Sequence, residues 1–176
     1  IKGGVNYLVV ALLEEALELR KEYHEIPILC LGMIENKDIE VATKNNITLS
    51  ILSSDYLNSI DINKLKDAKI HIKINTGMNR LGVSTKEEFN EVYQKLILNK
   101  INIEGIYSHI HTPNDLSMTT NQFRKFEYIT SDIDLSQIKI IHIQASDALT
   151  GFDKPEYVNG CRLGIIMYGY STDKTL

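Results

Sequence analysis

Apolar and polar positions follow two alternating patterns along the chain. Short runs rich in β-branched and other apolar residues predict buried strands near residues 7–11, 27–32, 47–52, 69–75, 102–109, 138–144 and 162–168. Between most of these runs the apolar residues recur with helical spacing, most clearly over residues 12–24, 86–99 and 118–133. Strands that alternate with amphipathic helices favour right-handed βαβ units and a parallel sheet.

The number of strands selects among the parallel α/β folds. About seven strands predict a (β/α)8 TIM barrel that lacks its first βα unit, and fit a doubly wound sheet less well. A Gly-x-Gly-x-x-Gly sequence does not open any predicted helix, so a dinucleotide-binding fold has no support. Neither a linker nor an internal repeat interrupts the pattern, and residues 1–176 are therefore interpreted as one domain. The chain opens without an initiator methionine, which indicates a fragment or a processed chain.

The composition excludes several classes of protein. The 176 residues are 43% hydrophobic and 24% charged with a net charge of -4, as in an ordinary globular domain with one sizeable core. An acidic chain without a basic patch is a poor partner for nucleic acid. No apolar run approaches the ~20 residues that span a bilayer, and no signal segment is visible. Cys30 and Cys161 look like buried thiols, which suggests a reducing cytoplasm.

In the first helix Ala16 and Leu17 should face the core, and Arg20 should face solvent.

Candidate chemistry lies where predicted strands end. The alternating strand over residues 69–75 breaks into a turn that carries Arg80, and a cation at the mouth of a barrel lies where barrels keep their chemistry. His109 ends the next strand and should point at the same mouth. Two plainer readings stay open, a solvated arginine and a histidine held by backbone groups. His109, His111 and a carbamylated Lys73 also resemble metal ligands, which makes a metal-dependent hydrolase a rival function, although no further ligand is evident.

The last two predicted strands carry the signals of an anion site. Ser146 follows the strand over residues 138–144, in a turn whose backbone N–H groups and hydroxyl suit a phosphate, although taken alone the serine is better explained as a helix N-cap without a ligand. Arg162 enters an apolar run and needs an anionic or acceptor partner if it is buried. Gly164 lets the backbone approach a ligand closely. In TIM barrels the loops after the last two strands usually bind phosphate.

Three motifs taken together resemble those of a known family. They are Thr-Gly-Met-Asn-Arg-Leu-Gly at 76–82, Gly-Ile-Tyr-Ser-His at 105–109 and Arg-Leu-Gly-Ile-Ile-Met-Tyr-Gly at 162–169. They are similar to the motifs of alanine racemases, which are pyridoxal-phosphate enzymes with an N-terminal barrel and a C-terminal β domain. Residues 9–20 and 27–32 are also similar and in register, so the resemblance covers essentially the whole chain.

The resemblance implies a role for each matching residue. Arg80 would contact the phenolic oxygen of the cofactor and hold the substrate carboxylate, and Lys73 would be carbamylated and would position Arg80. Arg162 would face the pyridine nitrogen, supported by a hydrogen bond from His109. The remaining cofactor contacts would come from Leu31, Ser146, Gly164 and Ile165, with the phosphate bound by the hydroxyl of Ser146 and the N–H groups of the last two. No metal site is implied.

The resemblance also implies what the chain lacks. The lysine that carries the cofactor would precede residue 1, and the catalytic tyrosine would come from the C-terminal domain of the other subunit of a homodimer. The isolated chain should then be inactive, while the full-length cytoplasmic enzyme would convert L-alanine into D-alanine for peptidoglycan.

Two departures from the family pattern keep a second substrate open. Ala145 stands where the family usually has Asn, and Asn114 stands where it usually has Asp, which adds a hydrogen-bond donor and removes a charge. A serine racemase of the same family is therefore one alternative. The metal-dependent hydrolase and a non-catalytic barrel module are the others.

Overall fold

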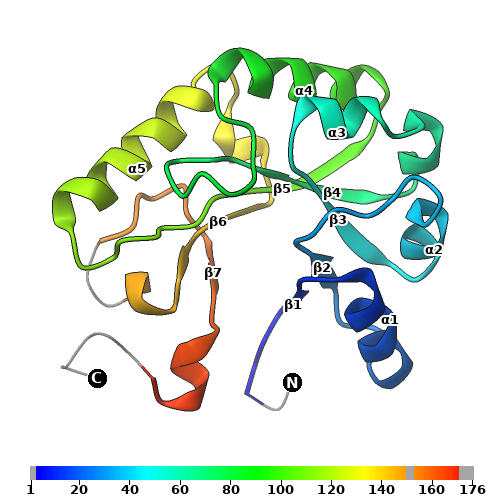
Figure 1. Cartoon of the computed structure of the whole chain (residues 1–176), viewed down its shortest axis with the longest axis horizontal. Coiled ribbons are helices and arrows are strands. Elements are labelled where there is room, and N and C mark those ends of the chain that lie inside the picture. The colour runs from blue at the N-terminus through cyan, green and yellow to red at the C-terminus, as the bar shows by residue number, and fades with distance from the viewer. Residues whose placement is uncertain (1–2, 150–152, 171–176) are drawn as a thin grey trace.

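Seven parallel strands form one curved sheet in the computed structural model, which describes residues 3–149 and 153–170 (Figure 1). The strands are β1 (Leu8–Val10), β2 (Ile28–Cys30), β3 (Ile47–Ile51), β4 (Lys69–Lys73), β5 (Asn102–Tyr107), β6 (Ile140–Ala145) and β7 (Gly160–Arg162). They pair in the order of the sequence, and every pair is parallel. The barrel of seven strands inferred from the alternation of patterns is confirmed.

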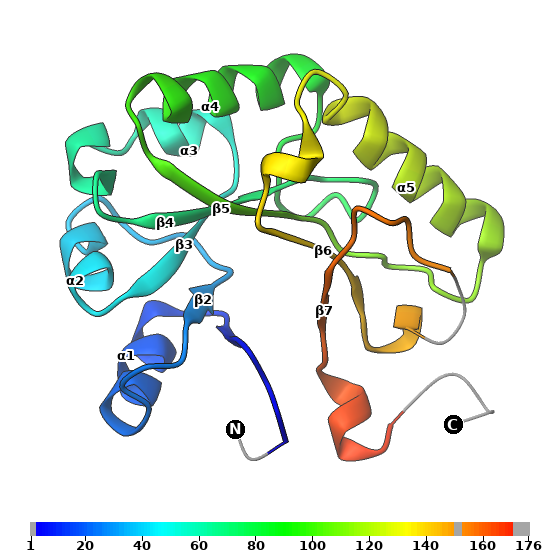
Figure 2. The ribbon, with the colours of Figure 1, turned by 180° about the vertical axis from the view of Figure 1, so that it is seen from behind.

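Helices cover the outer face of this sheet in both views (Figures 1 and 2). They are α1 (Leu13–Glu22), α2 (Ile39–Lys44), α3 (Ser54–Asn58), α4 (Lys86–Leu98) and α5 (Leu116–Ile129), joined by the short 3-10 helices η1 (Ile62–Leu65), η2 (Leu135–Gln137), η3 (Ser146–Leu149) and η4 (Ile165–Tyr168). The starts of the two longest helices follow from local chemistry, because the side chains of Thr85 and Asp115 accept hydrogen bonds from backbone N–H groups of the first turn. Within the described residues, no helix is both long and apolar enough to cross a membrane.

The two faces of each strand bury different kinds of side chain, because successive side chains point to opposite faces. In β3, Ile47, Leu49 and Ile51 join the hydrophobic core, whereas Thr48 and Ser50 are buried polar residues. The Tyr107 hydroxyl donates to Ser50 Oγ over 3.0 Å, a contact between β5 and β3, which are not neighbours in the sheet. Such contacts form only inside the curve of the sheet. The apolar core therefore lies between strands and helices, and the barrel interior is polar.

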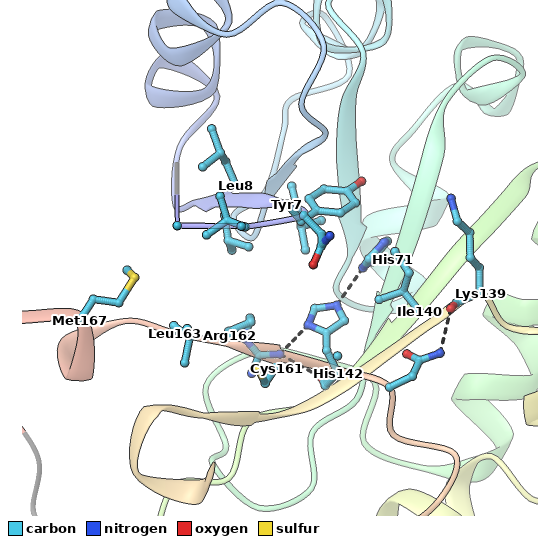
Figure 3. A pocket seen from close by; sticks show the side chains of 18 residues that line it. Tyr7, Leu8, His71, Lys139, Ile140, His142, Cys161, Arg162, Leu163 and Met167 are labelled. Atoms are coloured by element: carbon cyan, nitrogen blue, oxygen red, sulfur yellow. Dashed lines mark hydrogen bonds between the residues drawn. The ribbon is translucent and has the colours of Figure 1, made fainter. Parts of the chain in front are cut away.

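Strands β1 and β7 face each other across the open side of the barrel but are not paired (Figure 2). A cavity of about 650 Å³ lies between them. Tyr7 and Leu8 line it on one side, and Cys161 and Arg162 on the other (Figure 3). His71 and His142 also line it, so the cavity borders the polar interior.

The structure corrects three expectations drawn from the sequence. The last strand covers only Gly160–Arg162, and the apolar run that follows forms η4, with Ile165 and Met167 exposed. Arg20 is buried because it donates to four backbone carbonyl oxygens, so its position on the helix did not decide its exposure. Cys161 is exposed, and only Cys30 is a buried thiol.

Candidate active site at the carboxyl ends of the strands

Arg162 is the last residue of β7, and its guanidinium reaches the barrel interior. Nη1 donates to the backbone oxygen of His142 over 2.9 Å and lies 2.6 Å from His142 Nδ1. Nη2 donates to the backbone oxygen of Ser108 over 2.6 Å and lies 3.3 Å from His109 Nδ1. All four partners are neutral acceptors, so the partly buried guanidinium has the acceptor partners that its place in an apolar run required. Burial lowers the pKa of Arg162 to about 10, which still leaves it cationic at neutral pH.

His109 follows β5, and its Nδ1 atom is at the hydrogen-bond distance from Arg162 that the family resemblance implied. Because a guanidinium can only donate, His109 Nδ1 must be the unprotonated nitrogen of a neutral ring. Burial, followed by the neighbouring charges of Arg162 and Lys73, lowers the pKa of His109 to about 4. The ring therefore stays neutral near pH 7 and keeps an Nε2–H group free of the contact with Arg162.

Lys73 and Tyr107 end β4 and β5, so they lie at the same mouth as Arg162. The Nζ atom of Lys73 is 5.7 Å from the centre of the Tyr107 ring, and the guanidinium carbon of Arg162 is 5.4 Å from it. One aromatic ring therefore contacts two cations. Burial, followed by the charges of Arg80 and Arg162, lowers the pKa of Lys73 to about 8. Much more of this amine is neutral at pH 8 than of an ordinary lysine.

Arg80 lies in the turn between β4 and α4, and its side chain is exposed. The turn is built by Asn75, whose Oδ1 accepts from the N–H groups of Gly77 and Asn79. Gly82 closes it with a φ of 120°, and a Cβ atom there would lie 2.8 Å from the nitrogen of Asn75. Much of the glycine-rich motif therefore shapes the loop that places Arg80 beside the mouth.

The expected anion site lies where β6 and β7 end. Ser146 Oγ, which is nearly buried, accepts from the backbone N–H of Gly164 over 3.0 Å and from that of Ile166 over 3.5 Å. Ile165, the other expected phosphate contact, begins η4 directly after Gly164 and lies beside this pair of hydrogen bonds. Leu31, the remaining cofactor candidate, follows β2 and is half-buried.

The remaining candidates occupy the loop between β5 and α5. His111 Nδ1 lies 2.9 Å from Oε1 of Gln122 in α5, while His109 contacts Arg162, so the structure does not combine the two histidines and Lys73 as metal ligands. In the described part of the chain, no three His, Cys, Asp or Glu side chains are grouped so that they could hold a metal ion. Asn114 lies in an exposed turn of this loop.

Sequence reasoning missed four interior residues that stand behind this site, namely His71, Glu104, Tyr107 and His142. His71 and His142 alternate with isoleucines in β4 and β6, on the same face as Lys73 and Gln144. That alternation was sufficient to predict that both rings point into the barrel. It was not sufficient to predict that the two rings touch, because β4 and β6 are not adjacent.

Cationic and polar side chains gathered where parallel strands end define a ligand-binding α/β barrel. Residues 1–172 match the family model described as the N-terminal domain of alanine racemase. The chain is 37% identical over 179 residues to an alanine racemase of Clostridium tetani and 39% identical over 176 residues to one of Methanococcus maripaludis. These alignments cover 97% and 96% of the chain. This chain belongs to the alanine racemase family.

The structural comparison agrees with the sequence comparison. The model superposes on alanine racemase of Clostridium difficile 630 in complex with cycloserine with a TM-score of 0.84 and 30% sequence identity, covering 99% of this chain and 50% of that one. The chain spans about half the length of the curated relatives it matches, 46% and 47% for the two named above.

Proposed function

We propose that the full-length protein containing this chain is an alanine racemase that uses pyridoxal phosphate and supplies D-alanine for peptidoglycan. The observation that carries the proposal is the cation of Arg162, held by neutral acceptors at the mouth of a barrel of the alanine racemase family. Residues 1–176 would be most of the barrel domain. The full-length protein would add the C-terminal β domain and form the homodimer that the family resemblance implies.

The residues of the chain fit the two ends of the cofactor. The hydroxyl of Ser146 and the backbone N–H groups of Gly164 and Ile165 would bind the phosphate. The hydrogen bonds from the N–H groups of Gly164 and Ile166 to Ser146 Oγ support this assignment, because they bring the hydroxyl to the start of η4. The four hydrogen bonds of Arg162 use Nη1 and Nη2, so Nε–H is the donor that would face the pyridine nitrogen. When bound, pyridoxal phosphate withdraws electrons from the substrate and so stabilises negative charge at its Cα atom.

The permanent charge of Arg162 has a chemical consequence. A guanidinium beside the pyridine nitrogen disfavours protonation of that nitrogen, and the ring is then a weaker electron sink. Weaker electron withdrawal would suit racemisation, because it would disfavour transfer of a proton to the wrong carbon. His109 and His142 hold Arg162 in this role as neutral acceptors, which leaves its full positive charge uncompensated at close range.

Arg80 and Lys73 would serve the substrate. The loop places Arg80 near enough to Lys73 and His109 to lower the pKa of both, so a substrate carboxylate at the mouth would meet a guanidinium. A neutral Lys73 amine can add to carbon dioxide, and the carbamate would replace a positive charge with a negative one between Arg80 and Arg162. That negative charge would then orient Arg80.

The direct test is incubation of the full-length protein with L-alanine, and separately with L-serine, followed by chiral analysis and a visible absorption spectrum. We expect D-alanine and the absorption of enzyme-bound pyridoxal phosphate. The Arg162→Glu variant should lose racemisation by orders of magnitude and produce detectable transamination, Arg162→Lys should be less harmful, and the exposed Arg124→Glu should have no effect. Faster turnover of serine would indicate the serine racemase, and tightly bound zinc without cofactor absorption would indicate the hydrolase.

A further inference from the structure

A series of polar side chains in contact with one another runs from Arg162 across the barrel interior to Glu104. Arg162 Nη1 is 2.6 Å from Nδ1 of His142, and His142 Nε2 is 2.8 Å from Nδ1 of His71, as Figure 3 shows. His71 Nε2 in turn lies 3.6 Å from a carboxylate oxygen of Glu104. The series connects strands β7, β6, β4 and β5, so no local stretch of sequence contains it.

The hydrogen bonds of this series can run in only one direction, with each N–H group donating from the Arg162 end toward Glu104. Arg162 has only N–H groups to offer, so His142 Nδ1 must be an acceptor and its proton must sit on Nε2. That proton is donated to His71 Nδ1, which places the proton of His71 on Nε2, facing Glu104. The cation at one end and the carboxylate at the other therefore favour the same pair of tautomers. The 3.6 Å contact is longer than a hydrogen bond, so it is an electrostatic attraction between an N–H group and a carboxylate.

Glu104 is built into this position by an irregularity of the sheet. Ile70 of β4 pairs with Ile103, and the next residue, His71, pairs with Gly105, so Glu104 is skipped in the register. An extra residue of this kind redirects a side chain, and here the carboxylate is nearly buried inside the barrel. Gly105 leaves room for the ring, because a Cβ atom there would lie 2.6 Å from Cε1 of His71.

The charges around this series of side chains favour an ionised Glu104 and neutral rings at His71 and His142. His71 contributes most to lowering the pKa of Glu104, and Lys139 and Tyr7 lower it further, to about 2 against the opposing effect of burial. Lys139 Nζ donates to Glu104 over 3.0 Å, and the Tyr7 hydroxyl donates over 2.9 Å. Burial, reinforced by the charge of Arg162, lowers the pKa of both histidines although Glu104 opposes it at His71. The positive charge of Arg162 and the negative charge of Glu104 therefore lie at the two ends of this series of side chains, with two neutral rings between them.

We propose that Glu104 is a positioning residue for Arg162, acting through His71 and His142. A carboxylate that polarises one imidazole makes the opposite nitrogen of that ring a better acceptor, and the effect passes to the next ring. His142 Nδ1 thus becomes a stronger acceptor for Arg162 and holds the guanidinium in one orientation. The consequence for catalysis rests on the proposed function, whereas the direction of the hydrogen bonds does not.

The direction of these hydrogen bonds is tested by 15N NMR of the imidazole rings in the full-length, cofactor-free protein. His71 and His142, assigned with His→Gln variants, should both be neutral with the proton on Nε2. Both should stay so over about two pH units on either side of the usual histidine pKa near 6.5. A proton on Nδ1 of either ring, or titration of either ring in that range, overturns the proposal. This experiment is independent of racemase activity.

The reach of Glu104 is tested with Glu104→Gln, and Lys139→Gln is the matched control because it removes a partner of the same carboxylate without removing its charge. Glu104→Gln should shift the Nε2–H resonances of both His71 and His142, and Lys139→Gln should leave that of His142 in place. A shift confined to His71 overturns the relay.

In the full-length racemase, Glu104→Gln should lower kcat about five- to tenfold and leave KM within about twofold. An unchanged kcat with shifted rings rejects the positioning role, and a wild type without racemisation rejects the proposed function alone.

Discussion

Gly105 lies directly against the imidazole of His71: a Cβ atom at residue 105 would be 2.6 Å from Cε1 and 2.7 Å from Nδ1. Gly105→Ala should therefore displace the ring and lower the free energy of unfolding by roughly 1–3 kcal/mol, as overpacking of a buried site does. Urea unfolding measures this loss. Gly3→Ala is the matched control, because a Cβ atom at residue 3 meets nothing within 4 Å. Equal stability of the two variants would contradict the close contact.

Lys73 should make stability depend on pH above neutrality. Burial lowers its pKa from 10.5 to about 8, so between pH 8 and 10.5 the unfolded chain binds more protons than the folded one. The free energy of unfolding should therefore rise across this window, by on the order of 1–3 kcal/mol, and the cost of burying the ammonium should be fully present below pH 8.

Chemical denaturation of the wild type and of Lys73→Met at pH 7 and pH 9.5 measures this contribution. The tyrosines that titrate in the same range contribute equally to both proteins, so the difference between the two pH profiles isolates Lys73. Parallel profiles would show that the amine keeps its ordinary pKa in the folded state. With 13C-labelled bicarbonate, a carbamate signal should appear in the wild type and be absent from Lys73→Met.

Arg20 should contribute strongly to stability although it lies on a surface helix. Its guanidinium donates to the carbonyl oxygens of Tyr23, Ile26, Asn45 and Asn46 over 2.7–3.0 Å, and so ties the end of α1 to the end of α2. Arg20→Met should lower the free energy of unfolding by about 2–4 kcal/mol, because it leaves partly buried acceptors without donors. Thermal unfolding should show almost no change for Lys21→Met, the exposed neighbour in the same helix.

Asn114 should influence the choice between alanine and serine in the full-length enzyme. It lies in the turn between β5 and α5, on the side of the barrel where His109 and Arg162 meet. An amide donor there can contact a substrate hydroxyl, and one net hydrogen bond contributes ~1 kcal/mol, or about a five- to tenfold preference. Asn114→Asp should reduce kcat/KM for serine relative to alanine by that factor and leave cofactor binding unchanged. An equal loss on both substrates would mean that the residue only shapes the loop.

The sequence by itself determined the barrel and the neighbourhood of its site. Alternation of strands and amphipathic helices is a local signal, because each element must bury an apolar face of its own, and β1 to β6 and the longer helices lie where that signal placed them. Arg162 was found because a charge within an apolar run stands out, whereas Lys73 became a candidate through the family resemblance and as a possible carbamylated ligand. The last strand was predicted too long, since the apolar run over residues 165–168 is equally consistent with an exposed 3-10 helix.

Only the tertiary structure decided which groups these charges meet. Arg20 and Arg162 are both arginines in amphipathic or apolar surroundings, and each has acceptors that lie far away in the sequence, Asn45 and Asn46 for Arg20 and Ser108 for Arg162. The step from His71 to His142 joins β4 and β6, which are not adjacent in the sheet, and the contact of His71 with Glu104 depends on one skipped residue in the pairing of β4 and β5. A periodic pattern reports which face a side chain occupies, but the distance between two side chains on that face is set by the curvature and register of the sheet.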